Sequence, residues 1–129
     1  MKTRDKYSYF INSKKANINA LGLMSGTSLD GVDIALINTD GKENIILKEF
    51  ETYSYNKSLI DNIQNFIENR KGIKNTNFLL TKFHAESILL FLEKNNINYQ
   101  DIDIIGFHGQ TIYHSPNESW TWQLGDGQN

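Results

Sequence analysis

Residues 22–33 read Gly-Leu-Met-Ser-Gly-Thr-Ser-Leu-Asp-Gly-Val-Asp, a string of small and polar residues that joins two apolar runs. The first run covers residues 20–24 and stops at a Ser-Gly-Thr-Ser turn. The second covers residues 32–37 and stops at Asn-Thr-Asp-Gly. Short apolar runs bounded by such residues are typical of β-strands joined by turns. The sequence therefore predicts two consecutive strands with a tight polar turn between them.

A third strand and two helices are predicted next along the chain. The Asp40-Gly41 pair is a hairpin signal, and it leads into a strand over residues 45–55 that completes an antiparallel meander. Apolar residues then recur at helical spacing from a predicted N-cap at Ser58 to Lys71-Gly72, and again over residues 76–94.

Two more strands are predicted at residues 103–107 and 120–124, so the order is β-β-β-α(α)-β-β. This order indicates an α/β domain with a mixed sheet. Because a mixed sheet needs cover on both faces and two helices can cover only one, we expect the fold to be incomplete at its C-terminus.

The composition restricts the class of protein. The 129 residues carry a net charge of -2, which gives no reason to expect nucleic acid or an anionic membrane as a partner. Cysteine is absent, which excludes disulfides and thiolate metal sites and agrees with a reducing cytoplasm. No apolar run approaches the roughly 20 residues of a membrane-spanning helix. Residues 1–17 are polar and are predicted to be a disordered leader before a domain over residues 18–129.

The turn after the first strand has the composition of a phosphate-binding loop. Gly26 lets the backbone approach a ligand closely, neighbouring amides can form an anion-binding nest, and Thr27 and Ser28 add hydroxyl donors. Asp30 or Asp33 could hold Mg²⁺, which prefers carboxylate oxygen. The loop lacks the Gly-Lys-Ser/Thr ending of a P-loop, and the alternative interpretation is an ordinary hairpin turn.

Three segments together resemble the signatures of one enzyme family. They are residues 22–33, residues 108–116 (His-Gly-Gln-Thr-Ile-Tyr-His-Ser-Pro) and residues 123–127 (Gln-Leu-Gly-Asp-Gly). In this order and at these separations they resemble the signatures of anhydro-N-acetylmuramic acid kinases, and they span nearly everything from Leu21 to Gly127. The resemblance weighs against an ordinary hairpin turn.

This resemblance implies an activity, a fold and a set of partners. Members of the family phosphorylate 1,6-anhydro-N-acetylmuramic acid with ATP while water opens the anhydro ring. The product is N-acetylmuramic acid 6-phosphate, in the peptidoglycan recycling of the bacterial cytoplasm. Their fold has two ribonuclease-H-like lobes of the actin and hexokinase type, so this chain is expected to be the N-terminal part of the first lobe. The implied ligands are ATP, Mg²⁺ and the anhydro amino sugar, and the implied assembly is a homodimer.

The resemblance also implies roles for individual residues. The family's ATP-binding loop corresponds to Gly26, Thr27, Ser28, Leu29, Asp30, Gly31, Val32 and Asp33. Ligands of α/β sheets usually lie at the ends of strands, so the sugar is expected to contact His108, Gln110, Thr111, Gly125 and Asp126.

The metal ligands and the catalytic base are the two remaining parts of the expected site. Many members of the wider superfamily carry a metal-organising aspartate near the position that is Met24 here, so the metal is expected at Asp30, at Asp33 or at residues not present in this chain. The family's catalytic base is an aspartate of a later motif, expected beyond Asn129. The chain alone is therefore expected not to turn over substrate.

Two other functions remain open from the residues. One is a Ser/His/Asp hydrolase built from Ser25 or Ser28 with His108 and Asp126, although a Gly-x-Ser-x-Gly elbow is absent. The other is a truncated module that binds nucleotide or sugar without catalysis.

Four aromatic residues outside the proposed loop receive structural interpretations. His84 is predicted to be a boundary residue of the second helix, and His114 to face solvent at a rim. Trp120 and Trp122 share one face of a predicted strand and are predicted to lie in the core or on a packing surface, with sugar stacking by one of them as the second choice.

Overall fold

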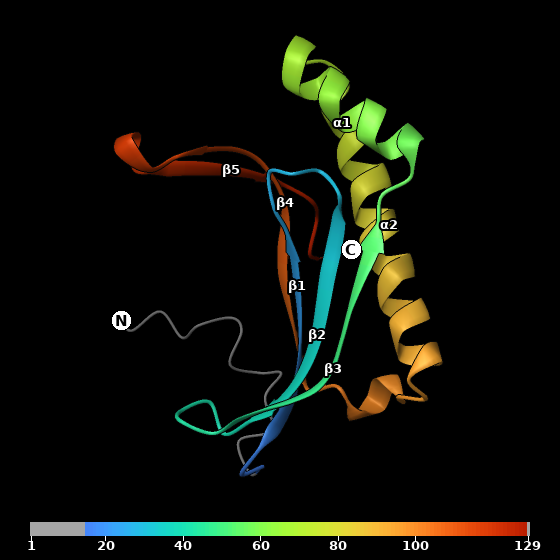
Figure 1. Cartoon of the computed structure of the whole chain (residues 1–129), viewed down its shortest axis with the longest axis vertical. Coiled ribbons are helices and arrows are strands. Elements are labelled where there is room, and N and C mark those ends of the chain that lie inside the picture. Colours follow the sequence, from blue (N-terminus) through green and yellow to red (C-terminus); the bar gives the residue numbers. More distant parts are fainter. Residues whose placement is uncertain (1–14, 129) are drawn as a thin grey trace, which may run out of the picture.

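The computed structural model describes residues 15–128 and contains one five-stranded sheet with two α-helices (Figure 1). The elements are β1 (Ile18–Ser25), β2 (Gly31–Thr39), β3 (Ile45–Ser54), α1 (Lys57–Asn69), α2 (Ile73–Lys94), the 3-10 turn η1 (Tyr99–Asp101), β4 (Ile104–Ser115), the 3-10 turn η2 (Pro116–Glu118) and β5 (Trp120–Leu124). The strand order is β3-β2-β1-β4-β5. Strands β1 and β4 are parallel, and the other neighbours are antiparallel. The predicted α/β mixed sheet with its N-terminal antiparallel meander is confirmed, and it agrees with a ribonuclease-H-like lobe.

One face of the sheet is buried because apolar residues alternate along β1 and β2. Leu21 and Leu23 of β1, and Val32 and Ile34 of β2, are at most 4% exposed and form one cluster with Phe91 of α2. Both helices lie on this side of the sheet (Figure 1). The cluster fixes α2 against the first two strands.

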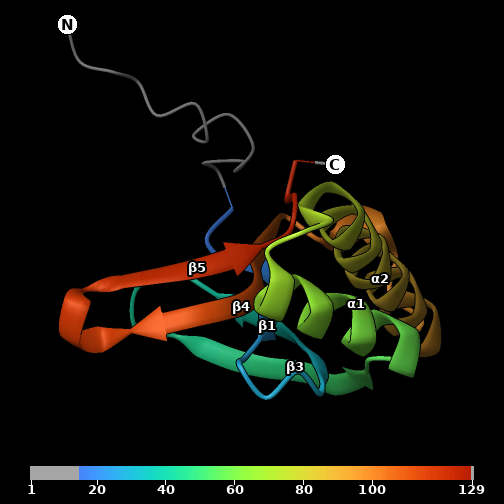
Figure 2. The same ribbon diagram turned by 90° about the horizontal axis from the view of Figure 1, so that it is seen from above.

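A second cluster joins α1 to the far end of the sheet. Leu59, Ile63 and Phe66 follow helical spacing and are buried along α1. They pack against Ile112 of β4 and Leu124 of β5. Beyond this cluster the β4–β5 hairpin extends away from the helices, which Figure 2 shows from above.

The two tryptophans of β5 have different surroundings. Trp122 joins the second cluster and meets the Phe66 ring edge-on, with ring centroids 5.5 Å apart, so its predicted packing role is confirmed. Trp120 is 46% exposed and stacks on Tyr113 of β4, outside the core. Trp120 therefore packs on the surface and not in the core, because the hairpin carries it past the helices.

The opposite face of the sheet is open. Met24 is 55% exposed, and it lines a shallow hollow together with Asp33, Phe50 and His108. This agrees with the expectation that two helices cover one face only.

The hairpin between β2 and β3 forms at the predicted Asp-Gly pair. The Asp40 carboxylate accepts hydrogen bonds from the backbone N–H groups of Lys42 and Asn44, at 2.9 and 3.1 Å. These bonds lower the pKa of Asp40. The aspartate thus stabilises a loop of residues 40–44.

The predicted helix boundaries are shifted by local capping. The N-cap of α1 is Asn56 and not Ser58, because the Asn56 side chain accepts the N–H of Leu59 at 2.8 Å. Arg70, in left-handed conformation, ends α1, and Gly72 instead precedes α2. Helix α2 therefore begins earlier than predicted.

Strand β4 is longer than predicted. It does not stop at Phe107 but continues to Ser115, because β5 pairs with it from Gln110↔Leu124 to Ser115↔Trp120. The second signature segment therefore lies within a strand and not beyond its end.

The predicted leader, residues 1–17, falls mostly outside the described residues and stays a prediction. Across residues 15–128, neither helix is both long and apolar enough to cross a membrane.

Candidate functional site

The loop between β1 and β2 is held at both ends and exposed in the middle. Thr27 and Ser28 are exposed, whereas Ser25, the last residue of β1, is 1% exposed. At the other end the Asp30 carbonyl accepts the N–H of Tyr55 at 3.0 Å, which ties the loop to the segment after β3. The loop therefore has a fixed base, and Thr27 and Ser28 are exposed in its middle.

The residues predicted to bind ATP divide into an exposed part and a part that shapes the loop. A Cβ on Gly26 would meet nothing within 4 Å, so there is free space beside it. A Cβ on Gly31 would lie 2.2 Å from the Tyr53 carbonyl oxygen, so glycine is required by the close approach of β2 to β3. Leu29 packs into the second cluster with a φ of 57°, and Val32 is fully buried. Contact of the whole set with ATP stays a prediction.

The two carboxylates predicted to bind Mg²⁺ lie in different environments. Asp30 is exposed and accepts the Ser28 hydroxyl at 2.8 Å. Asp33 accepts the Thr52 hydroxyl at 2.5 Å and lines the hollow of the open face. Within residues 15–128, no three His, Cys, Asp or Glu side chains gather in a way that could hold a metal. Mg²⁺ often takes only one or two carboxylates beside phosphate oxygens and water, so an exposed carboxylate at this loop fits that mode.

A buried polar network lies directly beneath the loop. The Ser25 hydroxyl lies 3.2 Å from His84 Nε2 and 3.0 Å from the Tyr55 hydroxyl. The Tyr55 hydroxyl also donates to Gln110 Oε1 at 2.8 Å, and Gln110 Nε2 donates to the Gly26 carbonyl. The network thus joins the first signature segment to the second.

His84 belongs to the core and is not a boundary residue. Its side chain is 1% exposed, and its ring meets that of Phe107 edge-on with centroids 5.3 Å apart. Burial lowers the pKa of His84, and the hydrogen bond to the Leu80 carbonyl opposes this only in part. Burial also raises the pKa of Tyr55 to about 12. Both groups are therefore neutral near pH 7.

Gly109 separates two residues that were predicted to act together. Its φ of 76° interrupts the alternation of β4, and the β1–β4 register shifts at the same level. His108 is exposed and lines the open face, whereas Gln110 is fully buried in the network. Thr111 is 8% exposed. Sugar contact by Gln110 stays a prediction, which its burial does not favour.

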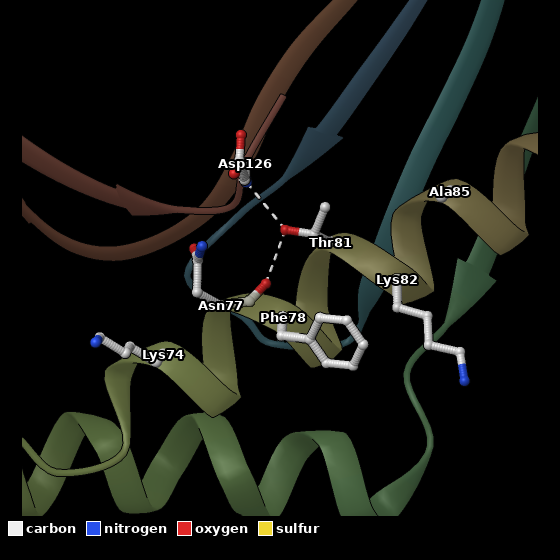
Figure 3. Close-up of a pocket in the computed structure, with 7 residues that line it drawn as sticks. All are labelled: Lys74, Asn77, Phe78, Thr81, Lys82, Ala85 and Asp126. Carbon is white, nitrogen blue, oxygen red and sulfur yellow. Dashed lines mark hydrogen bonds between the residues drawn. The ribbon is translucent and has the colours of Figure 1, made fainter. Parts of the chain in front are cut away.

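The third signature segment is attached to α2. The N–H of Gly125 donates to Asn77 Oδ1 at 2.6 Å, and the N–H of Asp126 donates to the Thr81 hydroxyl at 2.9 Å. Figure 3 shows Asp126 directly opposite Thr81 at the edge of a pocket that Lys74, Asn77, Phe78 and other residues of α2 line. A Cβ on Gly125 would lie 2.5 Å from the Phe107 ring, so the segment wraps tightly over that side chain.

This attachment predicts a measurable effect of Asn77→Ala on hydrogen exchange. The Gly125 amide loses its acceptor, so we expect it to exchange roughly fivefold faster, from a loss of about 1 kcal/mol of local stability. Asn75→Ala is the control, because the Asn75 side chain makes only an exposed 3.4 Å contact to Asn62. Equal exchange at Gly125 in both variants would contradict the attachment.

The residues of the hydrolase alternative do not come together. Ser25 is buried and faces His84, whose Nδ1 contacts the Leu80 carbonyl at 2.9 Å and not a carboxylate. Ser28 bonds to Asp30, and His108 lies on the open face of the sheet. A buried serine without a carboxylate behind its histidine is no accessible nucleophile.

Helix α2 contributes site residues that sequence reasoning missed. Asn77, Thr81 and His84 are spaced by four and three residues, so they share one face of the helix with the apolar Leu80 and Ile88. Polar residues on an otherwise apolar helical face were the available signal, because each needs a buried partner. His114 is exposed, as predicted.

Comparison with known proteins identifies one family. The family model described as anhydro-N-acetylmuramic acid kinase matches residues 18–129. A protein of that name from Zymomonas mobilis is 42% identical over 120 residues, covering 84% of this chain and 33% of the relative. A protein of the same name from Brucella canis is 39% identical over 118 residues, and one from Bradyrhizobium diazoefficiens is 41% identical over 122 residues. Each match covers 84% of this chain and 32% of the relative. The chain thus spans about a third of the length of these relatives.

Proposed function

Because the chain belongs to the anhydro-N-acetylmuramic acid kinase family, we propose that it forms the ATP phosphate-binding segment of such a kinase. The reaction we propose for the complete enzyme is transfer of the ATP γ-phosphoryl group to 1,6-anhydro-N-acetylmuramic acid, with opening of the anhydro ring by water. A homodimer and a cytoplasmic location follow from the same family membership and are proposals of the same kind.

The observation that carries the proposal is the form of the loop after β1. Its middle is exposed and has free space beside Gly26, while its base is held by a buried network. Phosphoryl transfer depends mainly on positioning and on charge stabilisation by fixed donors. The amides near Gly26 and the hydroxyls of Thr27 and Ser28 would bind phosphate oxygens. Asp30 or Asp33 would hold Mg²⁺, which supplies positive charge to the phosphates.

The substrate side of the site is proposed on the open face and at the third segment. His108 is exposed beside the hollow of the open face. Gly125 and Asp126 are held by α2 on the other side of Phe107. We propose that His108 contacts the sugar, and that the catalytic aspartate belongs to a segment outside the third of the family's length that this chain matches.

A chimera tests the proposed function directly. Residues 18–129 replace the matching segment of the Zymomonas mobilis relative, and the product is incubated with ATP, Mg²⁺ and 1,6-anhydro-N-acetylmuramic acid. We expect ADP and a phosphosugar, detected by mass spectrometry, with the unmodified relative as positive control. A folded chimera that neither binds ATP nor forms product would overturn the proposal.

The second candidate is a module that binds nucleotide without turnover, and the one-third coverage favours it for the isolated chain. The same experiment includes the 129-residue chain alone. Saturable ATP binding without product by the chain, together with turnover by the chimera, is the result we expect.

Gly26→Ala is expected to weaken ATP binding without loss of stability. The added methyl group would occupy the space in which a phosphate approaches the backbone. The KM of the chimera for ATP should therefore rise about tenfold. The free energy of unfolding should change by less than about 0.5 kcal/mol, because nothing lies within 4 Å of the new Cβ. Gly22→Ala, whose added Cβ also meets nothing within 4 Å, is the control for stability and should leave the free energy of unfolding unchanged. An unchanged KM for Gly26→Ala would contradict the assigned role.

A further inference from the structure

Four polar side chains are buried in the network beneath the loop, although burial of a polar group costs desolvation energy. Ser25, Tyr55, His84 and Gln110 come from β1, the segment after β3, α2 and β4, and each is at most 6% exposed. None of the described buried side-chain polar atoms lacks a partner. A fully satisfied buried network selects one conformation and costs desolvation energy, so its position in the fold indicates what it orders.

The direction of each hydrogen bond in the network is determined by chemistry. The Leu80 carbonyl can only accept, so His84 Nδ1 carries the proton and the neutral ring presents Nε2 as an acceptor for the Ser25 hydroxyl. The single Tyr55 proton is shared between Gln110 Oε1 at 2.8 Å and the Ser25 oxygen at 3.0 Å. These directions leave the two N–H donors of Gln110 for backbone carbonyls.

Those donors orient one peptide group of the loop. Gln110 Nε2 donates to the carbonyls of Gly26 and Thr111, so the Gly26 carbonyl points inward to the network. In a planar trans peptide the carbonyl of one residue and the N–H of the next point in opposite directions. No cis peptide occurs in the described part of the chain. The N–H of Thr27 therefore points away from the core, toward the exposed side of the loop.

We infer that His84 and Tyr55 are positioning residues that hold the Gly26–Thr27 peptide with its N–H outward, as a donor for a phosphate oxygen of ATP. Tyr55 acts by holding Gln110 and Ser25, and His84 acts by holding Ser25 at the start of the loop. This inference rests on the proposed ATP-binding role of the loop. Neither residue lies in the three signature segments, and neither side chain is exposed to a ligand.

Tyr55→Phe in the chimera is the first test. It removes one buried hydroxyl and retains the edge-on packing of the ring against Phe83 at 5.0 Å. We expect the KM for ATP to rise about tenfold while the KM for the sugar stays unchanged, because only the phosphate donor is displaced. Tyr53→Phe is the matched control, since the Tyr53 hydroxyl contacts Glu51 outside the network. It should change neither KM.

Two substitutions of His84 give a second, independent test. The amide of His84→Gln can reach the position of Nε2 and accept from Ser25, whereas the shorter amide of His84→Asn can reach only the Leu80 carbonyl. Asn95 already makes the equivalent bond to the carbonyl four residues earlier, at 2.9 Å. We expect the glutamine variant to keep the KM for ATP within about twofold and the asparagine variant to raise it about tenfold.

The outcomes separate this inference from the proposed function. A folded parent chimera that does not bind ATP would refute the proposed function. The positioning role alone would be overturned by a different result. In that case the parent chimera turns over ATP, and the Tyr55→Phe and His84→Asn variants lose stability but keep the parent's KM for ATP. If Tyr55→Phe does not fold, the two His84 variants decide: equal KM values for ATP in both would reject the inference.

Discussion

Gly109→Ala is expected to lower the free energy of unfolding by about 3 kcal/mol or more. Two independent costs add at this position. The residue has a φ of 76°, and an added Cβ would lie 2.3 Å from the Leu124 carbonyl oxygen. Because Leu124 is paired with Gln110 across the β4–β5 ladder, the carbonyl has little freedom to move. Urea denaturation of the 129-residue chain measures the loss.

Gly41→Ala separates these two costs. Gly41 has a φ of 73°, but an added Cβ would meet nothing within 4 Å, so the variant bears the cost of the backbone conformation only. We expect it to lose about 1 kcal/mol. Similar losses for Gly41→Ala and Gly109→Ala would show that the close approach of β5 to Gly109 is not rigid.

Gln110→Met is expected to cost about 3 kcal/mol of stability and to weaken ATP binding in the chimera. The substitution keeps most of the side-chain volume but leaves the Tyr55 hydroxyl and the Gly26 carbonyl without this partner. Each buried polar group left unsatisfied costs roughly 1–3 kcal/mol. Denaturation curves and the KM for ATP are the two measurements.

Gln123 provides the matched control for the loss of stability. Gln123→Met changes the same residue type on the neighbouring strand, where the amide makes only contacts of 3.4 and 3.5 Å, so its stability should change by less than about 0.5 kcal/mol. If Gln110 contacted the sugar directly, Gln110→Met would raise the KM for the sugar and leave stability unchanged. Its complete burial makes us expect the opposite.

Much of the architecture could be predicted because local patterns and tertiary packing agree. Apolar runs bounded by turn residues indicated strands β1 and β2, and the Asp-Gly pair indicated the hairpin at residues 40–44. The boundary errors at Asn56 and Gly72 arose where capping side chains and a left-handed glycine outweighed the apolar periodicity.

The sequence revealed the three signature segments of the candidate site but not the buried residues beneath them. The signature segments were visible because turn residues and glycines cluster in them. His84 and Tyr55 were not visible, because they come from α2 and the segment after β3 and meet Ser25 only once the sheet and helix pack together. Contacts between residues so far apart in sequence carry no local pattern.

The sequence by itself determined the order of strands and helices, the exposed polar loop after β1 and the family to which the chain belongs. Only the tertiary structure decided which residues of the second segment are exposed and which are buried. In a regular strand, side chains two residues apart lie on the same face, so His108 and Gln110 would share one side of β4. The positive φ of Gly109 places them on opposite sides. Glycine is required there for two physical reasons: the positive φ, and the approach of β5, which leaves no room for a Cβ.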